Sequence, residues 1–299
     1  MYDVIIIGAG ISGLTAAIYS SRASLKTLVI EKGIYGGQIV NSPNIENYPG
    51  IANISGADLS NNLYNQARNL GTLIVFDDVL DVKKEKSEFI IETKKEKYKS
   101  KTVIIATGTK NRTLNIGEEK FIGRGVSYCA TCDGALYKDK TVAVVGGGNT
   151  ALDDVLYLSS ICKKIYLIHR RDEFRAQQSI IDKISNIKNV ELILNSVVLS
   201  VGGEQRVDSI EIKNLVTDEK SSLSVDGLFI AIGQVPQNRI FKGLINIDEN
   251  GYIVANDDCK TNVEGIFTAG DCRTKNLRQL VTASADGAIS ATNVSKFLS

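Results

Sequence analysis

Short apolar runs recur along the chain, and most of them end in glycine or in a polar residue. They cover residues 3–7, 103–105, 141–145, 165–168 and 228–232. Runs of this kind predict strands that are buried on both faces, as in a parallel sheet. Helical spacing of apolar residues follows the first and the third run. Alternating strand and helix predict an α/β fold.

Other segments have different periodicities. Residues 74–93 alternate in the manner of half-buried strands, and the Lys- and Glu-rich stretch 83–101 predicts a solvated meander of hairpins rather than a charged binding surface. Shorter alternating segments lie at 191–193 and 209–212. Helical patterns cover residues 57–70 and 280–291. We therefore expect a β-meander beside each set of parallel strands.

The first apolar run leads directly into Gly8-Ala9-Gly10-Ile11-Ser12-Gly13. In a strand, turn and helix of this form, the glycines allow a tight turn, the approach of a pyrophosphate and close packing of helix on strand. The helix N-terminus offers N–H groups to the phosphates. Glu31 follows 23 positions after Gly8, where an acid binds the ribose hydroxyls. This segment predicts a dinucleotide site.

The same plan begins again at residue 141. Gly146-Gly147-Gly148-Asn149-Thr150-Ala151 follows a strand, and His169 lies 23 positions after Gly146, where the first copy has its acid. Here His169 is followed by Arg170 and Arg171, with Arg175 one turn later. Arginines accommodate a 2′-phosphate. The second copy is therefore predicted to take NADPH, with His169 as a positioning residue.

Composition limits the class of protein. The chain has 299 residues, 43% of them hydrophobic, and a formal charge of +1, which gives no electrostatic reason to expect nucleic acid or an anionic membrane as a partner. The N-terminus has no signal-peptide pattern, and no apolar run reaches the length of a membrane span. A two-domain protein of the cytoplasm is expected.

The chain has 5 cysteines, and two of them form the segment Cys129-Ala130-Thr131-Cys132-Asp133. A Cys-x-x-Cys pair next to a carboxylate is typical of a redox dithiol, with the carboxylate exchanging protons with the thiols. The alternatives are half of a zinc site and two ordinary buried cysteines. Zinc would need two further ligands, but the chain has a single histidine and its other cysteines are scattered. No metal site is expected.

Together these motifs resemble the low-molecular-weight bacterial thioredoxin reductases over essentially the whole chain. The segments that carry the resemblance include the two glycine motifs, the cysteine pair, Glu46-Asn47-Tyr48-Pro49-Gly50, residues 169–176 and Thr268-Ala269-Gly270-Asp271. The resemblance implies two Rossmann-like dinucleotide-binding domains, the second inserted into the first. We expect an FAD domain at 1–112 and 241–299 and an NADPH domain at 113–240.

The resemblance also implies roles for individual residues. FAD would be bound by Gly8, Gly10, Ile11, Ser12, Gly13, Glu31, Gln38, Asn47, Asp271, Arg278 and Gln279. NADPH would be bound by Gly146, Gly148, Asn149, Thr150, Arg170, Arg171 and Arg175, with His169 beside them. Further cofactor contacts are expected at Lys32, Gly37, Gly108, Ile232, Gly233 and Gly270. Cys132 would take electrons from the flavin, Cys129 would attack the thioredoxin disulfide, and Asp133 would be the acid and base.

The resemblance further implies a homodimer. The thiol pair and the NADPH site belong to the inserted domain and both must reach one flavin, so we expect this domain to swing about connections near 111–117 and 236–243. One departure concerns the partner, because Ala135-Leu136 stands where the family often has two bulky aromatic residues. The resemblance implies thioredoxin or a thioredoxin-like protein as the substrate, and this departure leaves open which of them it is. Competing readings are a flavoprotein that serves another acceptor, such as a ferredoxin, and a zinc- or nucleotide-sensing module.

Overall fold

The computed structural model describes residues 1–299, and the chain divides into two compact units. The first unit consists of Met1–Lys110 and Val235–Ser299, and the second unit is the inserted segment Asn111–Gln234. The return to the first unit comes six residues earlier than the expected boundary after residue 240. The reason is that Asn238 and Phe241 are buried in the first unit, where Asn238 Nδ2 donates to the Cys272 carbonyl at 2.7 Å.

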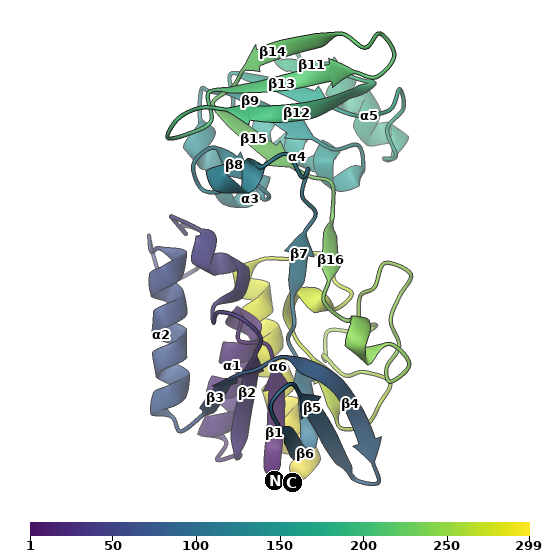
Figure 1. Ribbon diagram of the computed structural model, residues 1–299. Helices are drawn as coiled ribbons and strands as arrows, with labels where there is room; N and C mark the ends of the chain where they lie inside the picture. The colour runs from purple at the N-terminus through teal and green to yellow at the C-terminus, as the bar shows by residue number, and fades with distance from the viewer. The chain divides into compact units, whose positions relative to one another are not determined.

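The first unit is built on one seven-stranded sheet (Figure 1). Strands β3, β2, β1 and β6 are parallel neighbours in that order, β17 also pairs in parallel with β6, and β5 and β4 continue the sheet as an antiparallel meander. The strands are β1 (Tyr2–Ile7), β2 (Thr27–Glu31), β3 (Leu73–Phe76), β4 (Val79–Glu85), β5 (Glu88–Thr93), β6 (Lys97–Ile105) and β17 (Ile266–Thr268).

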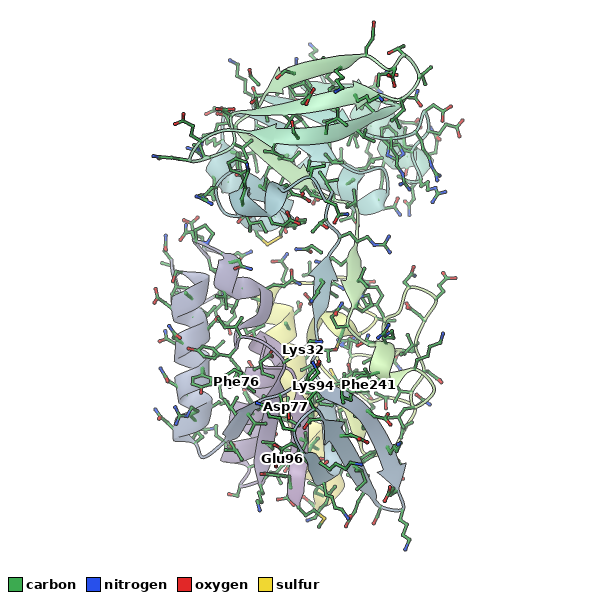
Figure 2. All side chains as sticks on the ribbon, viewed as in Figure 1. Lys32, Phe76, Asp77, Lys94, Glu96 and Phe241 are labelled. Carbon is green, nitrogen blue, oxygen red and sulfur yellow. A yellow bond between two sulfur atoms is a disulfide. The ribbon has the colours of Figure 1, made fainter.

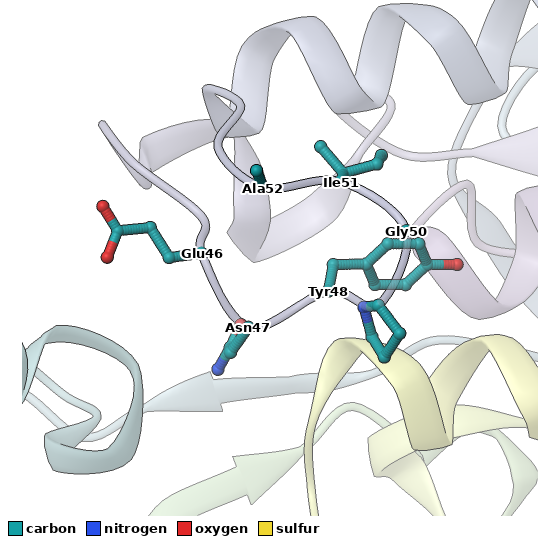
Figure 3. Close-up of a pocket in the computed structure, with 7 residues that line it drawn as sticks. Glu46, Asn47, Tyr48, Gly50, Ile51 and Ala52 are labelled. Carbon is teal, nitrogen blue, oxygen red and sulfur yellow. The ribbon is translucent and has the colours of Figure 1, made fainter.

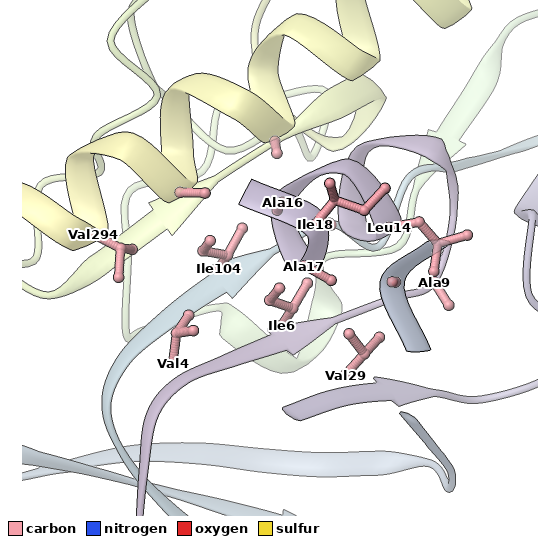
Figure 4. Packing of buried hydrophobic residues seen from close by; sticks show 14 of the residues in the cluster. Val4, Ile6, Ala9, Leu14, Ala16, Ala17, Ile18, Val29, Ile104 and Val294 are labelled. Atoms are coloured by element: carbon pink, nitrogen blue, oxygen red, sulfur yellow. The ribbon is translucent and has the colours of Figure 1, made fainter. Parts of the chain in front are cut away.

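Three helices belong to this unit: α1 (Ile11–Arg22), α2 (Gly56–Asn69) and α6 (Leu280–Leu298). Helices α1 and α6 pack against each other over the parallel strands, where their apolar side chains meet Val4, Ile6 and Ile104 (Figure 4). Their close approach depends on Gly287, since a Cβ there would overlap the Ser12 carbonyl oxygen of α1. Helix α6 extends seven residues beyond the expected end at Ala291.

The meander is fixed to the parallel strands by Asp77, which follows β3. Its Oδ2 accepts hydrogen bonds from Thr93 Oγ1 at 2.5 Å and from the Lys95 backbone N–H at 3.1 Å. Figure 2 shows Asp77 close to Lys32 and Lys94. The next residue, Asp78, pairs with Lys32 at 3.2 Å and with Lys94 at 3.1 Å. Lys32, an expected cofactor contact, therefore lies at the end of β2 beside this ion-pair cluster.

The second unit repeats the plan with a five-stranded parallel sheet in the order β11, β10, β9, β15, β8 (Figure 1). A separate three-stranded antiparallel sheet, β12, β13 and β14, is its meander. The strands are β8 (Val126–Ser127), β9 (Thr141–Val145), β10 (Lys164–Ile168), β11 (Val190–Ile193), β12 (Ser196–Gly202), β13 (Ser209–Asn214), β14 (Lys220–Ser224) and β15 (Gly227–Ile230). The helices are α3 (Ala130–Asp133), α4 (Asn149–Ser159) and α5 (Gln178–Ser185).

Two short strands carry the chain from one unit to the other. They are β7 (Thr109–Asn111) and β16 (Gln234–Pro236), which pair as a two-stranded sheet. Five short 3-10 helices complete the structure: η1 (Gly37–Asn41), η2 (Glu118–Phe121), η3 (Gly134–Tyr137), η4 (Arg239–Phe241) and η5 (Gly270–Cys272). None of the helices has the length and apolar character needed to cross a membrane.

Candidate active site

The first glycine motif forms the turn between β1 and the N-terminus of α1. A Cβ at Gly13 would overlap the Gly8 carbonyl oxygen, whereas a Cβ at Gly10 would meet nothing within 4 Å. No side chain caps the start of α1, so the N–H groups of its first turn, including those of Ile11 and Ser12, remain available to a ligand. Glu31 fixes the turn, since its carboxylate accepts the Ala9 and Gly33 N–H groups, each at 2.7 Å.

Other expected cofactor contacts of the first unit gather around the same turn. The Gly36 N–H donates to the Ala9 carbonyl at 2.7 Å, which brings Gly36 and Gly37 beside Gly10. Gln38 Nε2 in turn donates to the Thr109 carbonyl at 2.8 Å, one residue after Gly108. A Cβ at Gly270 would lie 2.6 Å from Ser12 Oγ, so the turn after β17 reaches the start of α1.

Asp271 is the most informative residue of this group. Its Oδ1 is buried and has no hydrogen-bond partner in the protein. Burial raises the pKa of the Asp271 carboxyl, while Lys275 and Arg278 lower it. Arg278 Nε lies 3.4 Å from the Asp271 carbonyl oxygen, and its guanidinium stacks over Tyr252. A buried carboxylate oxygen without a partner calls for a donor such as a ligand hydroxyl.

The Gly270-Asp271 turn rests on a buried ion cluster that the motifs did not indicate. Asp286 of α6 accepts the Gly270 N–H at 3.0 Å, two bonds from Arg273 at 2.9 and 2.8 Å, and one from Lys275 Nζ at 2.8 Å. All three charged side chains are at most 6% exposed. The cluster fixes the turn that presents Asp271, and its only sequence signal was an acid within an apolar helix.

Asn47 and Gln279 come from distant parts of the first unit. Asn47 Nδ2 donates to Gln279 Oε1 at 3.2 Å, and Tyr48 Oη bonds to Ser284 Oγ at 3.3 Å, which ties loop 45–54 to the start of α6. The loop lines an open cavity of about 560 Å³ formed by Glu46–Ala52 (Figure 3). The expected contacts therefore lie together at the carboxyl ends of β1, β2, β6 and β17.

The second glycine motif has the same construction in the second unit. A Cβ at Gly148 would meet nothing within 4 Å, and no side chain caps α4, which begins at Asn149 and Thr150. A Cβ at Gly147 would overlap the imidazole ring of His169. His169 is buried, stacks on Phe174 and bonds through Nε2 to the Glu173 carbonyl at 3.1 Å. Burial lowers the His169 pKa, so the ring is a neutral support beneath the loop.

The three arginines lie in the loop that His169 supports. The Arg175 N–H donates to the Gly147 carbonyl at 2.7 Å, so the loop is joined to the glycine turn. Arg170, Arg171 and Arg175 are exposed, and none of them pairs with a carboxylate within 4 Å. Their positive charge is therefore available to an anion bound at Gly148. Ile232 and Gly233 follow β15, the strand next to β9.

Cys129 and Cys132 form a disulfide, with their Cα atoms 5.3 Å apart. Cys129 is half-buried and Cys132 is exposed. Thr131 Oγ1 lies 3.5 Å from Cys129 Sγ and must be the donor, because a disulfide sulfur has no proton. Asp133 ends α3, and burial raises the pKa of its carboxyl, although a 2.6 Å hydrogen bond from Ser127 Oγ lowers it.

The disulfide and the second glycine motif share one edge of the second unit's sheet. Cys129 comes two residues after β8, Gly146 comes directly after β9, and all five strands of this sheet are parallel. Their carboxyl ends therefore lie on the same edge. Two strand spacings separate β8 from β9, which is about 10 Å. The unit carries a nucleotide-type loop and a redox-active pair side by side.

These features fit the two cofactors that the sequence predicts. For FAD they are the open space at Gly10, the uncapped α1, Glu31 and the buried Asp271 oxygen. For NADPH they are the open space at Gly148, the uncapped α4 and the three unpaired arginines. Both sets combine N–H donors at a helix start with a group that recognises ribose or phosphate.

The chain is similar in sequence and in structure to known thioredoxin reductases. The sequence profile described as "Pyridine nucleotide-disulphide oxidoreductase" matches residues 2–287. The thioredoxin reductase of Listeria innocua is 44% identical over all of this chain and 94% of its own length, and that of Bacillus subtilis is 43% identical over 100% and 95%. The crystal structure of thioredoxin reductase from Streptococcus pyogenes, 40% identical, superposes with a TM-score of 0.96 over 100% of this chain and 98% of that one.

Proposed function

The chain belongs to the pyridine nucleotide-disulphide oxidoreductase family, and we propose that it acts as an NADPH- and FAD-dependent thioredoxin-disulfide reductase. The observation that carries the proposal is the Cys129–Cys132 disulfide at the sheet edge that also holds the second glycine motif. The net reaction takes two electrons from NADPH and leaves them on the two sulfurs of thioredoxin, which becomes a dithiol.

FAD is assigned to the first unit and NADPH to the second. Gly8, Gly10, Gly13 and the start of α1 would hold the FAD pyrophosphate, Glu31 would hold a ribose, and Asp271 would accept a hydrogen bond from a hydroxyl of the flavin side chain. Asp271 is the strongest support for the assignment, because its buried oxygen otherwise lacks a partner. When bound, FAD accepts a hydride from NADPH and passes two electrons to the disulfide.

In this proposal the second unit binds the nicotinamide nucleotide and determines the preference for NADPH over NADH. The start of α4 would bind the NADPH pyrophosphate at Gly148, and Arg170, Arg171 and Arg175 would hold the 2′-phosphate through charge-assisted hydrogen bonds. His169 is assigned a positioning role, which its burial and its lowered pKa support. A neutral ring adds no charge of its own to that of the arginines.

The residues around the disulfide carry out the thiol exchange. Two electrons break the Cys129–Cys132 bond, Cys132 receives them first, and Asp133 gives a proton to one of the sulfurs. The Cys129 thiolate then attacks one sulfur of thioredoxin, and the S–S bond of thioredoxin breaks as a mixed disulfide forms. Asp133 takes back the proton of Cys132, and Cys132 attacks Cys129 and restores the starting bond. The two released thioredoxin thiolates take up two protons from the surrounding water and become the dithiol.

The partner is thioredoxin or a thioredoxin-like protein. The exposed Leu136 and its neighbour Ala135 form a small, weakly apolar surface beside the disulfide, which supports selection of a cognate partner. We assign the protein to the cytoplasm as a homodimer, in line with the resemblance to thioredoxin reductases. We expect neither nucleic acid nor a membrane as a binding partner.

The test is NADPH oxidation by the FAD-loaded protein with thioredoxin as acceptor. We expect thiols to appear on thioredoxin in proportion to the NADPH consumed, with much slower turnover on NADH. Cys129→Ser and Cys132→Ser should each abolish thiol formation. The matched control is Cys162→Ser, because Cys162 is a buried free cysteine in the same unit that has no part in the exchange. Wild-type protein that consumes NADPH without making thiols would refute the proposal.

A further inference from the structure

Ser127 is a buried serine two residues before the disulfide, and the proposed exchange does not yet use it. Ser127 is 4% exposed and is the last residue of β8, where it pairs with Phe229 of β15. Its Oγ has three neighbours: the Asp133 carboxylate Oδ2 at 2.6 Å, the Cys129 carbonyl oxygen at 3.3 Å and the Cys129 N–H at 3.1 Å. One hydroxyl therefore connects the acid to both backbone groups of the attacking cysteine.

A hydroxyl has one proton, so Ser127 can serve only one of its two acceptors at a time. When Asp133 is ionised, Ser127 donates to Asp133 Oδ2 and accepts from the Cys129 N–H. When Asp133 is protonated, the carboxyl O–H can donate to Ser127 Oγ, and the serine proton then turns to the Cys129 carbonyl. The buried hydroxyl and the Cys129 N–H are satisfied in both arrangements, so neither carries the penalty of an unmade hydrogen bond.

We propose that Ser127 is a positioning residue for thiol exchange, holding Asp133 in both of its protonation states and tying each state to the Cys129 backbone. This inference rests on the proposed function. In the reductive step, two electrons from the reduced cofactor break the Cys129–Cys132 bond, and one sulfur takes the proton of Asp133. Ser127 then turns from the Cys129 carbonyl to Asp133 Oδ2, and the second sulfur remains a thiolate.

Other titratable groups lie on the elements that follow Asp133 or pack against α3. Burial and the Asp133 charge raise the pKa of Tyr137, in η3, to about 12. Asp226 and Cys162 also raise this pKa, and Arg206 lowers it. Helix α4, which packs on α3, contributes Asp153, Asp154 and Tyr157.

Asp154 needs its own control, because burial, together with the Asp153 charge, raises its pKa to about 7. For Asp133 itself, burial raises the pKa and the Ser127 hydroxyl lowers it. Removing that hydroxyl should therefore move the pKa of Asp133 upward, and leave the titration of Asp154 where it is.

The experiment separates the two half-reactions in the FAD-loaded protein. One measurement is the rate at which NADPH-reduced protein transfers electrons to oxidised thioredoxin, as a function of pH, and the other is flavin reduction by NADPH. In Ser127→Ala we expect exchange to slow about tenfold and the acid limb of its pH profile to move up by about one pH unit, as for a lost hydrogen bond to a charged group. Flavin reduction should keep the wild-type rate.

Three further variants make the result decisive. Ser127→Thr keeps the hydroxyl and should give the wild-type pH profile of thiol exchange. Asp154→Asn should leave the acid limb of that profile at its wild-type pH. Ser127→Ala should have no additional effect on exchange when Asp133→Asn is already present. A wild-type profile in Ser127→Ala, or an equal slowing in the Asp133→Asn background, would overturn the inference. Wild-type protein unable to reduce thioredoxin would instead refute the proposed function.

Discussion

At the scale of single residues, the glycines of the two nucleotide loops are of two kinds. A side chain at Gly13 or Gly147 would collide with the protein itself, at the Gly8 carbonyl and at the His169 ring. A side chain at Gly10 or Gly148 would meet open space. The first kind is needed for packing. The second kind has no reason within the protein to be glycine, which points to a ligand that approaches the backbone there.

Gly148→Ala should therefore fold normally and bind NADPH poorly. Its φ of −101° suits any residue, so only the methyl group at the pyrophosphate position matters. We expect the NADPH KM to rise at least about tenfold, the cost of roughly one lost hydrogen bond to a charged group, with the melting temperature unchanged. Gly147→Ala is the contrast, because it should lower the melting temperature by displacing His169. An unchanged KM in Gly148→Ala would contradict this reading.

The arginines allow a second prediction at this scale. Replacing Arg170 and Arg171 together by Gln should raise the NADPH KM strongly and the NADH KM little, because each charge-assisted bond to a 2′-phosphate is worth roughly 1.5–3 kcal/mol. The measurement is kcat/KM for both nucleotides. Lys183→Gln with Lys188→Gln removes the same charge from exposed positions of the same unit and is the control. Equal losses with NADPH and NADH would mean that the arginines support structure.

At the scale of elements, helices α4 and α6 each carry an acid that is half-buried or buried. In α4 this group is Asp154, whose pKa burial raises to about 7, with help from the Asp153 charge. In α6 it is Asp286. Burial alone would raise the Asp286 pKa, but hydrogen bonds from Arg273 and Lys275 lower it below its ordinary value. The two acids should therefore affect stability in opposite ways.

Asp154→Asn should stabilise the protein at alkaline pH. The folded state favours the protonated carboxyl, so the wild type loses stability as the pH rises from the unfolded value near 3.8 through the folded value of about 7. Asn imitates the protonated form and avoids that loss, which amounts to at most about 4 kcal/mol. Thermal melting at pH 5 and pH 8 is the measurement. A gain in melting temperature that is equal at both pH values would contradict the assignment.

Asp286→Asn should destabilise the first unit by roughly 3–5 kcal/mol, because it leaves two buried cations without their carboxylate. An amide has one oxygen for the four hydrogen bonds that the carboxylate accepts, so the bond from the Gly270 N–H should weaken and FAD retention with it. Unfolding in denaturant and the flavin content after gel filtration measure the two effects. The control is Asp257→Asn, since Asp257 is fully exposed and lies 3.9 Å from the same guanidinium. A result for Asp286→Asn like that of the control would refute the role of the cluster.

The sequence predicted these elements unevenly. The sequence predicted a strand, a glycine turn and a helix wherever an apolar run is directly followed by a glycine motif, as at β1 and α1 or at β9 and α4. It could do so because these patterns are local. The disulfide and Asp133 were found in the same way. Ser127 and Asp286 were missed, since their importance comes from contacts with residues that only the fold brings near, such as Gly270 for Asp286. The short connecting strands β7 and β16 were also missed, because three residues give no periodic signal.

At the scale of the whole molecule, the two copies of the repeat in the sequence correspond to the two units, and the second unit is inserted in the sequence of the first. The domain boundary expected after residue 240 differs from the observed division at 234 because the apolar signal of Ile240 and Phe241 belongs to the first unit's core. The assignment of one cofactor to each unit, and a swing of the inserted unit about its two connections, stay predictions. The swing follows from the assignment, because the assignment puts the disulfide and the flavin in different units of one chain.

The most direct test of the account is an anaerobic titration of the FAD-loaded protein with NADPH, counting electrons and thiols. A flavin and a disulfide that are both reduced by NADPH take up two electrons each. We predict that wild-type protein consumes two NADPH per chain and gains reactive thiols at Cys129 and Cys132, whereas Cys132→Ser consumes one and still loses its flavin absorbance. If the wild type consumed one NADPH per chain and its cysteines stayed unreactive, electrons would not pass to the disulfide and the account would be wrong.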